Sequence, residues 1–328
     1  MTTDLRDLPV FICGHPKSGT SLLRGILDSH PELVTYPEET GFFRRYLPKA
    51  QGQPLDEKLA LSDQFLTHIF DWNRENPPPN QAGFPDRDYS NISAQAIRDT
   101  QRRLVRERLD HDGDILSAAV LAYGEVVGKL TPRLRWWVEK TPYNERFVSQ
   151  IFSFWPQARC VHMVRDPRDN YSSYVRKHPD WTPAGFAGSW RTSTLAGLRN
   201  EKTFGSDRYL IIRYEDFALQ PEATISRLCA FLGIQDSDAM RQPTRDGRPW
   251  QGNSMFPDQF NGISAAPVGR WHELVSPTDC FVIETLCAAP MSSLHYEHSK
   301  KNARHIPISL RLRTYKTLIM TTLKENSR

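Results

Sequence analysis

Five short apolar runs recur along the chain, and segments with apolar residues every three or four positions separate them. The apolar runs lie at residues 9–13, 30–35, 136–139, 159–164 and 208–214. The helical patterns lie at residues 144–154, 167–177, 183–199 and 221–232. Unbroken apolar runs predict strands that are buried on both faces, as in a parallel sheet. Their alternation with helices predicts a three-layer α/β fold around a central parallel sheet of about five strands.

The segment from residue 40 to residue 134 breaks this alternation. It contains the stretch NPPPN at residues 76–80, and proline excludes both a helix interior and a central strand. Around this stretch lie polar helical patterns, for example at residues 94–109. We interpret the segment as a mainly helical insertion over the sheet edge. Residues 1–299 then form a single domain, and residues 300–328 form a tail.

Composition places the chain among soluble globular proteins, with 39% hydrophobic and 24% charged residues. No run of about eighteen apolar residues occurs, so no membrane span is expected. The first residues, MTTDLRDLP, do not resemble a secretory signal. The five cysteines are odd in number and form no C-x-x-C pair, which argues against disulfides and zinc. We therefore expect a cytoplasmic setting and no metal site.

Charge is spread unevenly along the chain. Residues 300–328 carry eight basic residues against one acidic residue, whereas the rest carries 34 basic and 37 acidic residues. The body therefore lacks the positive charge of a nucleic-acid-binding surface, and no nucleic-acid partner is expected. The tail is expected to be a solvated terminal helix. A peripheral contact with an acidic acceptor or a membrane surface is the alternative.

A glycine loop, CGHPKSGTS at residues 13–21, connects the first predicted strand to a helix. Backbone N–H groups of such a loop and of the helix start bind anions. The spacing is close to the G-x-x-x-x-G-K-[ST] loop of nucleotide hydrolases, but Thr20 occupies the lysine position and Lys17 comes three residues earlier. A sulfuryl group carries less charge than a phosphoryl group, so a lysine inside the loop suits a phosphosulfate anhydride.

The stretch PKSGTS resembles the 5′-phosphosulfate loop of sulfotransferases, which use 3′-phosphoadenosine-5′-phosphosulfate (PAPS) as co-substrate and release 3′,5′-adenosine diphosphate (PAP). The resemblance implies a fold like that of P-loop nucleotide hydrolases, with no required metal. It also implies that the loop binds the phosphosulfate through Lys17, Ser18, Gly19, Thr20 and Ser21.

A second motif, VRDPRDNYSSY at residues 164–174, follows a predicted strand. Asp166 and Pro167 are favourable residues for a helix start. The motif is similar to the 3′-phosphate site of the same family, in which an arginine is followed eight positions later by a serine. The resemblance implies that Arg165 and Ser173 bind the 3′-phosphate of PAPS.

Later segments agree with this resemblance less fully. Tyr214 matches a tyrosine of the family that touches the adenine, although an aromatic residue at a strand end has an equally simple structural explanation. The family usually places basic residues before a late G-x-W stretch. Here the stretch SAAPVGRW at residues 264–271 lacks them. Ser264 or Arg270 is expected to substitute.

The acceptor side lacks the K-T-H stretch of small-molecule sulfotransferases. The stretch YPEETGFF at residues 36–43 instead looks like the tyrosylprotein and heparan-type branches, in which a glutamate is the base. Glu39 matches that position, with Glu38 as the second candidate. The stretch VEKTP resembles carbohydrate sulfotransferases and implies that Lys140 lies near the sulfate. Glu39 also fits a solvated loop carboxylate, and Lys140 also fits a strand that ends in an exposed ion pair.

The sequence therefore predicts a PAPS-dependent sulfotransferase that acts on a hydroxyl by in-line displacement. The acceptor is left open among carbohydrate, peptide tyrosine, lipid and natural-product alcohols. Two alternatives remain: a P-loop kinase or NTPase, which Thr20 at the lysine position argues against, and a non-catalytic nucleotide-binding protein. A dimerisation signature of the cytosolic members is not found after Trp271, so the oligomeric state is not predicted.

Overall fold

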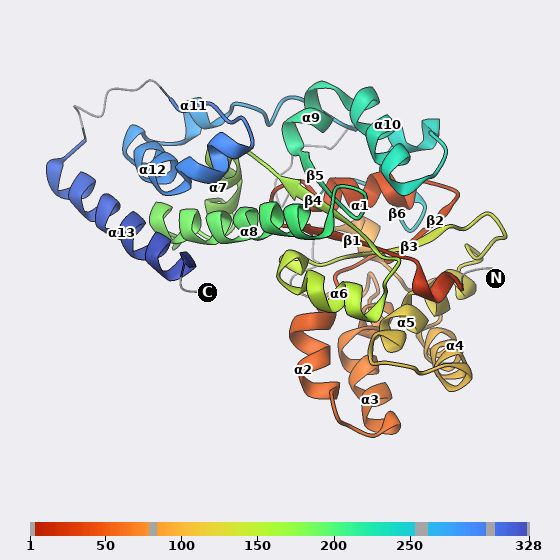
Figure 1. Ribbon diagram of the computed structural model, residues 1–328. Coiled ribbons are helices and arrows are strands. Elements are labelled where there is room, and N and C mark those ends of the chain that lie inside the picture. The colour runs from red at the N-terminus through yellow and green to blue at the C-terminus, as the bar shows by residue number, and fades with distance from the viewer. Residues whose placement is uncertain (1–3, 79–83, 253–261, 300–305, 327–328) are drawn as a thin grey trace.

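The computed structural model describes residues 4–78, 84–252, 262–299 and 306–326. At its centre lies a five-stranded sheet in the order β2–β3–β1–β4–β5, in which all neighbours are parallel (Figure 1). The strands are β1 (Pro9–Gly14), β2 (Leu33–Thr35), β3 (Trp136–Lys140), β4 (Arg159–Val164) and β5 (Tyr209–Arg213). The prediction of about five parallel strands is confirmed.

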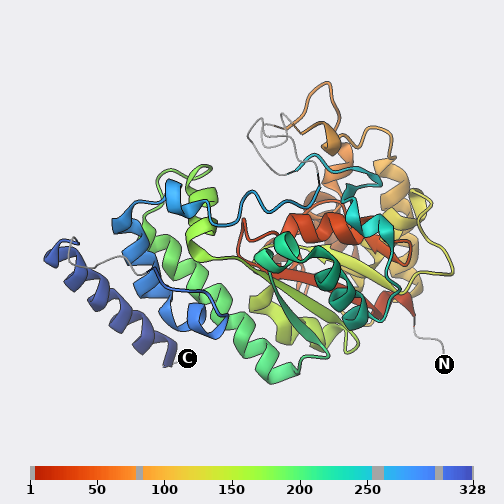
Figure 2. The ribbon, with the colours of Figure 1, turned by 90° about the horizontal axis from the view of Figure 1, so that it is seen from above.

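Helices cover both faces of the sheet. They are α1 (Thr20–Asp28), α5 (Gly113–Val126), α6 (Val148–Phe154), α8 (Pro183–Phe204), α10 (Pro221–Leu232) and α12 (Pro277–Ser293). Val10 and Ile12 of β1 join one apolar cluster with α1 and α10, because alternate strand residues point to opposite faces. Phe11 and Cys13 join a second cluster with the other four helices. The sheet is therefore the middle layer of three (Figure 2).

The strand register brings several carboxyl ends to one edge of the sheet. Ile12 of β1 lies beside Lys140, the last residue of β3. Gly14, the last residue of β1, lies beside Met163 near the end of β4. The glycine loop, the residues after Lys140 and the segment after β4 therefore leave the sheet side by side, where an open α/β sheet binds its ligand.

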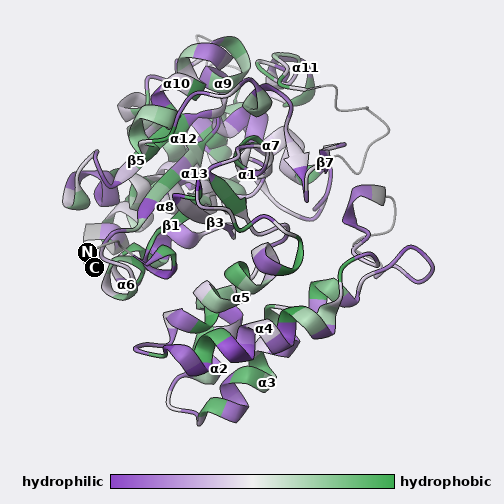
Figure 3. Cartoon of the chain, turned by 90° about the vertical axis from the view of Figure 1, so that its right-hand side faces the viewer, coloured by the Kyte–Doolittle hydropathy of each residue, from purple (hydrophilic) through white to green (hydrophobic). Residues whose placement is uncertain are grey.

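The connection between β2 and β3 is mainly helical. Besides α5 it contains α2 (Leu47–Ala50), α3 (Leu55–Phe65) and α4 (Ala94–Glu107). Hydrophilic and hydrophobic residues are interspersed along α3 and α4 (Figure 3), as expected for polar helices at the surface. Helix α5 differs from that expectation, because nearly all of it is buried against the central core. Residues 79 and 80 of the NPPPN stretch lie outside the described residues.

The remaining elements lie after β4 and around the ends of the sheet. They are α7 (Pro167–Val175), α9 (Tyr214–Leu219), α11 (Trp271–Leu274), α13 (Ile308–Asn326), β6 (Thr244–Arg245) and β7 (Arg248–Pro249). Helix α13 packs beside α12. Across the described ranges, every helix is too short or too polar to cross a membrane. These ranges also contain no group of three or more His, Cys, Asp or Glu side chains placed to hold a metal ion.

Candidate active site

The glycine loop is held tightly against the end of β4. Gly14 and Gly19 have φ values of 132° and 96°, in the region that side chains disfavour. A Cβ atom at Gly14 would lie 2.4 Å from the Met163 carbonyl oxygen, and one at Gly19 would lie 2.7 Å from Cδ2 of Tyr214. Lys17 also adopts a positive φ of 66°, which is strained for a residue with a side chain. The backbone of the loop is therefore restricted to one specific conformation.

The start of α1 has no side-chain cap and no acidic residue in its first turn, as suits a helix start that binds an anion. Its N-cap is Gly19. The first amides of a helix, here beginning with Thr20, point out of the helix start. Ser18 plays a different part, because its hydroxyl lies 2.6 Å from the His15 carbonyl oxygen and its amide donates to the same oxygen. Ser18 therefore shapes the loop instead of presenting its side chain to a ligand.

Glu145 holds the glycine loop in place through hydrogen bonds, and the sequence did not reveal this contact. Its carboxylate accepts the Gly14 amide at 2.9 Å and the Ser193 hydroxyl at 2.6 Å. Burial raises the pKa of Glu145. The contact ties the glycine loop to α8 and fixes its position relative to the sheet.

Arg165 and Ser173 form the pair that the second motif predicts. Arg165, which lies between β4 and α7, donates from Nη1 to Ser173 Oγ of α7 at 3.1 Å. The guanidinium lies 4.7 Å from the centre of the Tyr214 ring, so these three predicted residues meet. Arg165 Nη2 donates to the Pro267 carbonyl at 2.8 Å. Arg165 Nε is buried and has no hydrogen-bond partner among the described residues, as expected of a group that waits for an anion.

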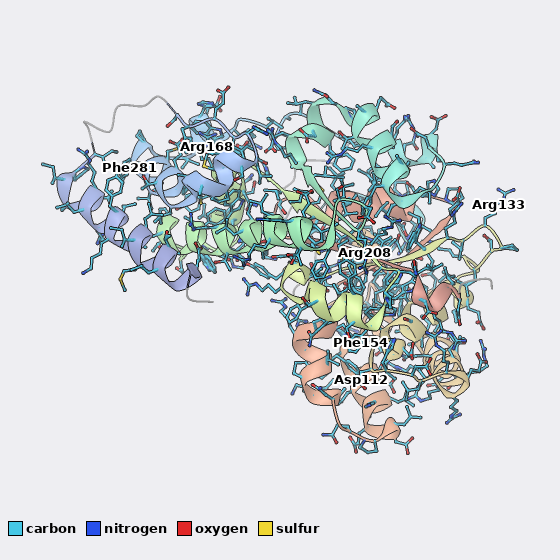
Figure 4. All side chains as sticks on the ribbon, in the orientation of Figure 1. Asp112, Arg133, Phe154, Arg168, Arg208 and Phe281 are labelled. Atoms are coloured by element: carbon cyan, nitrogen blue, oxygen red, sulfur yellow. The ribbon has the colours of Figure 1, made fainter. Side chains whose placement is uncertain are left out.

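The second half of the RDPRD motif anchors the late loop, a role that was not predicted from the sequence. Asp169 accepts the amides of Gly269 at 2.7 Å and Trp271 at 2.8 Å. Arg168, which is labelled in Figure 4, lies 3.8 Å from the centre of the Trp271 ring and pairs with Asp166. The repeated arginine and aspartate within the motif were the available signal.

Neither expected substitute in the late loop contributes a contact to Arg165. The side chains of Ser264 and Arg270 are exposed, and Ser264 Oγ accepts the Ala266 amide at 3.1 Å. The loop reaches Arg165 through the Pro267 carbonyl instead. This carbonyl positions the Arg165 guanidinium but adds no positive charge, so it does not replace the basic residues that the family usually places there.

Across the carboxyl edge of the sheet lies a cleft of about 340 Å³. Lys17, Glu39 and Lys140 all line it, so the structure brings the three predicted catalytic residues together. Seven basic and two acidic side chains line the cleft in total, which makes it cationic. The basic residues are Lys17, Arg24, Arg45, Arg87, Lys140, Lys177 and Arg245, and the acidic residues are Glu38 and Glu39.

Glu39 and Lys140 form a close ion pair inside this cleft. Lys140 Nζ donates to Glu39 Oε1 at 2.5 Å, and 44% of the Glu39 side chain remains exposed. Burial by the surrounding protein acts to raise the pKa of Glu39, but the charge and hydrogen bond of Lys140 outweigh it and lower the pKa. Burial lowers the pKa of Lys17 to about 8, and the charges of Lys177 and Lys140 add to this effect.

Glu38 is buried in a network of side chains in the wall of the same cleft. It pairs with Arg87 and accepts the Tyr89 hydroxyl at 3.0 Å, and Arg245 lies 3.8 Å away. Burial acts to raise the pKa of Glu38, but Arg245 and Arg87 lower it to about 2. Of the two adjacent glutamates, Glu39 is therefore the one available to an acceptor.

Glu139 fixes the relative position of Glu39 and Lys140, a role that no local sequence pattern indicates. Its buried carboxylate accepts the hydroxyls of Thr40 at 2.8 Å and Thr141 at 2.6 Å. Asn144 Nδ2 donates to the same carboxylate at 2.7 Å. Because Thr40 follows Glu39 and Thr141 follows Lys140, this carboxylate joins the loop after β2 to the end of β3.

The chain has a central parallel sheet, a glycine loop after β1 and Arg165 after β4. These features define an α/β protein with a P-loop-like arrangement. Residues 9–238 match the sequence profile of the Sulfotransferase family, and the chain belongs to that family. The solved sulfotransferase domain of the Synechococcus PCC 7002 olefin synthase shares the fold, with a TM-score of 0.56 and 22% identity. That match covers 88% of this chain and 95% of the domain.

The amino-acid sequence of the chain is also similar to those of two curated relatives. The chain is 26% identical over 237 residues to protein-tyrosine sulfotransferase A of Caenorhabditis elegans, a match that covers 70% of this chain and 50% of the relative. It is 26% identical over 244 residues to protein-tyrosine sulfotransferase 1 of Danio rerio, with 72% and 56% covered. The chain thus spans about half the length of the curated relatives it matches.

Proposed function

We propose that this chain transfers the sulfuryl group of PAPS to the hydroxyl of an acceptor. The observation that carries the proposal is the arrangement at the carboxyl edge of the sheet. An uncapped helix start and the Arg165–Ser173 pair provide two anion sites, and a glutamate–lysine pair lies in the cleft beside the first. A P-loop kinase is less well supported, because Lys17 occupies the loop and Thr20 the usual lysine position.

The residues present fit the two charged ends of PAPS. Thr20 and Ser21 would hold the 5′ end through their amides and hydroxyls. Arg165, with its unpartnered Nε, and Ser173 would hold the 3′-phosphate, and Tyr214 would lie at the adenine end. When bound, PAPS supplies the sulfuryl group that is transferred.

We expect Arg165→Ala to weaken binding of both PAPS and PAP by about 10- to 150-fold, because a charge-assisted hydrogen bond contributes roughly 1.5–3 kcal/mol. Isothermal calorimetry with PAP measures this loss without any turnover. Arg159→Ala is the matched control, because Arg159 is the first residue of β4 and Arg165 directly follows the last one. An Arg165→Ala protein with unchanged PAP affinity would remove Arg165 from the nucleotide site.

Glu39 acts as the general base in this proposal. It accepts the proton of the acceptor hydroxyl while the acceptor oxygen bonds to sulfur and the bond from sulfur to the bridging oxygen breaks. Lys17 stabilises the charge that the leaving phosphate gains. Lys140 stabilises the sulfuryl oxygens, and its movement away from Glu39 toward them would release the base.

The proposed acceptor is a hydroxyl on a carbohydrate, a peptide tyrosine, a lipid or a natural-product alcohol. The curated relatives are named for protein tyrosine, which makes tyrosine-containing peptides the first acceptors to test. We also propose a cytoplasmic location. All five cysteines are free and buried, which fits a reducing compartment.

The test is an incubation of the full chain with sulfur-labelled PAPS and an acceptor library, including tyrosine peptides and a cell lysate. We expect labelled products that depend on active protein and persist when divalent metals are chelated. PAP binding without any transfer would favour the non-catalytic alternative. Transfer of label from γ-labelled ATP, with none from PAPS, would establish the kinase alternative.

A further inference from the structure

Helix α13 has an inner face that docks on the protein. Thr314 is buried on this face, and the partly buried Leu310 and Leu318 pack against the core. Near the end of the helix, Glu325 pairs with Arg191 of α8 at 2.8 Å. These contacts fix the rotation of α13 about its own axis, and therefore also fix which residues face outward.

The outer face of α13 is apolar. Its residues recur at intervals of three or four positions, which keeps them on one side of a helix, and between 46% and 72% of each residue is exposed. They are Ile308, Leu312, Tyr315, Ile319 and Leu323. We call this set the α13 stripe; it runs roughly 24 Å along the helix. Single exposed apolar residues are ordinary, but a continuous stripe marks an interaction surface.

Basic side chains flank the α13 stripe. At 100° per residue, Arg311 lies on one side of the stripe, and Arg313 and Lys316 lie on the other. Glu325 is the only acidic residue of the segment 300–328, and it is already paired with Arg191. The surface that meets this stripe must therefore accept both apolar side chains and positive charge.

These two demands select between possible occupants. Two copies of the chain that paired through their stripes would bring the flanking cations of both copies together without acidic partners. Each stripe is also a convex ridge on a single helix, and Figures 1 and 2 both place α13 at the outer end of the molecule. A ridge with an apolar crest and basic flanks matches a helix that lies in the headgroup region of a bilayer.

We propose that α13 binds an anionic lipid surface, with the α13 stripe in the headgroup and acyl boundary and Arg311, Arg313 and Lys316 at the lipid phosphates. This inference does not depend on the proposed sulfuryl transfer. It assigns to the basic tail the peripheral contact that the charge pattern left as an alternative.

The test is sedimentation of the full chain with vesicles of phosphatidylcholine, alone or mixed with phosphatidylglycerol. We expect binding to the mixed vesicles that weakens as salt rises, and little binding to phosphatidylcholine alone. The double variant Leu312→Ser/Ile319→Ser keeps every charge and should bind the mixed vesicles at least about tenfold more weakly. Arg313→Gln/Lys316→Gln keeps the stripe and should lose about tenfold on the mixed vesicles only.

The matched control is Leu219→Ser, which removes an equally exposed leucine from α9. It should bind vesicles like the unmodified chain, and all variants should retain their unfolding temperature and PAP affinity. Unchanged vesicle binding by the Leu312→Ser/Ile319→Ser variant would overturn the proposal. The proposal would also be overturned if the chain bound no vesicles and light scattering showed a dimer that this variant dissociates. A second copy would then cover the α13 stripe.

Discussion

Glu39→Gln is expected to lower kcat by about 10²–10⁴, because glutamine keeps the size of the side chain but cannot accept the acceptor's proton. PAP affinity should stay nearly unchanged, since Glu39 contacts Lys140 and not the helix start or Arg165. Single-turnover assays with saturating PAPS isolate the chemical step. Near-normal turnover of the variant would show that another group is the base.

The pH dependence gives a second readout for Glu39. Lys140 holds the pKa of this carboxyl below its ordinary value of 4.5, so the base is ionised throughout the neutral range. The rate should therefore rise with pH only in the acid range and should be flat with respect to this group above it. In Glu39→Gln this ascending limb should disappear from the residual rate.

Glu38→Gln is the matched control, because it makes the same chemical change at the neighbouring residue. Glu38 is buried against Arg87, Arg245 and Tyr89, so the variant should unfold at lower temperature. In the unmodified protein the pKa of Glu38 is about 2, which lies below its unfolded value. The stabilising effect of the Glu38 carboxylate is therefore present above pH 4.5 and is lost as pH falls toward 2. The folded Glu38→Gln protein should keep most of its kcat, in contrast to Glu39→Gln.

The difference between these two glutamates shows what the sequence could and could not predict. The motif around residues 36–43 identified both carboxylates, but their environments are set by residues far away in the chain. Arg245 lies 207 positions after Glu38, and Lys140 lies 101 positions after Glu39. No local pattern encodes such pairings, so only the fold could separate a buried network from an available base.

Elements whose sequence pattern is local, in contrast, could be predicted. The apolar run of β4 and the pattern of α10 are local, and both elements have the predicted bounds, Arg159–Val164 and Pro221–Leu232. Helix α5 was overlooked because it is apolar nearly all round, which leaves no polar face to show a helical period. The supporting carboxylates Glu139 and Glu145 look like any other glutamate in the sequence, and their roles depend on burial.

Lys17→Ala is expected to lower kcat by about 10²–10³, as for the loss of one group that stabilises developing charge. The loss in PAPS affinity should be much smaller, because the bridging oxygen gains its charge only as the bond to sulfur breaks. Stopped assays at saturating PAPS and calorimetry with PAPS in the absence of an acceptor measure the two effects separately. An unchanged kcat with a raised KM for PAPS would mean that Lys17 binds the ground state and transition state equally.

Lys17→Arg tests the charge of this side chain directly. Burial and the neighbouring lysines lower the pKa of Lys17 to about 8, so the free protein loses this ammonium as pH rises through that value. The protonated form is the one that stabilises the leaving phosphate, and kcat/KM for PAPS should therefore fall above about pH 8. Arginine stays protonated at every accessible pH. The descending limb should consequently vanish in Lys17→Arg, even if the longer side chain lowers the plateau, whereas an unmoved limb would assign that titration to another group.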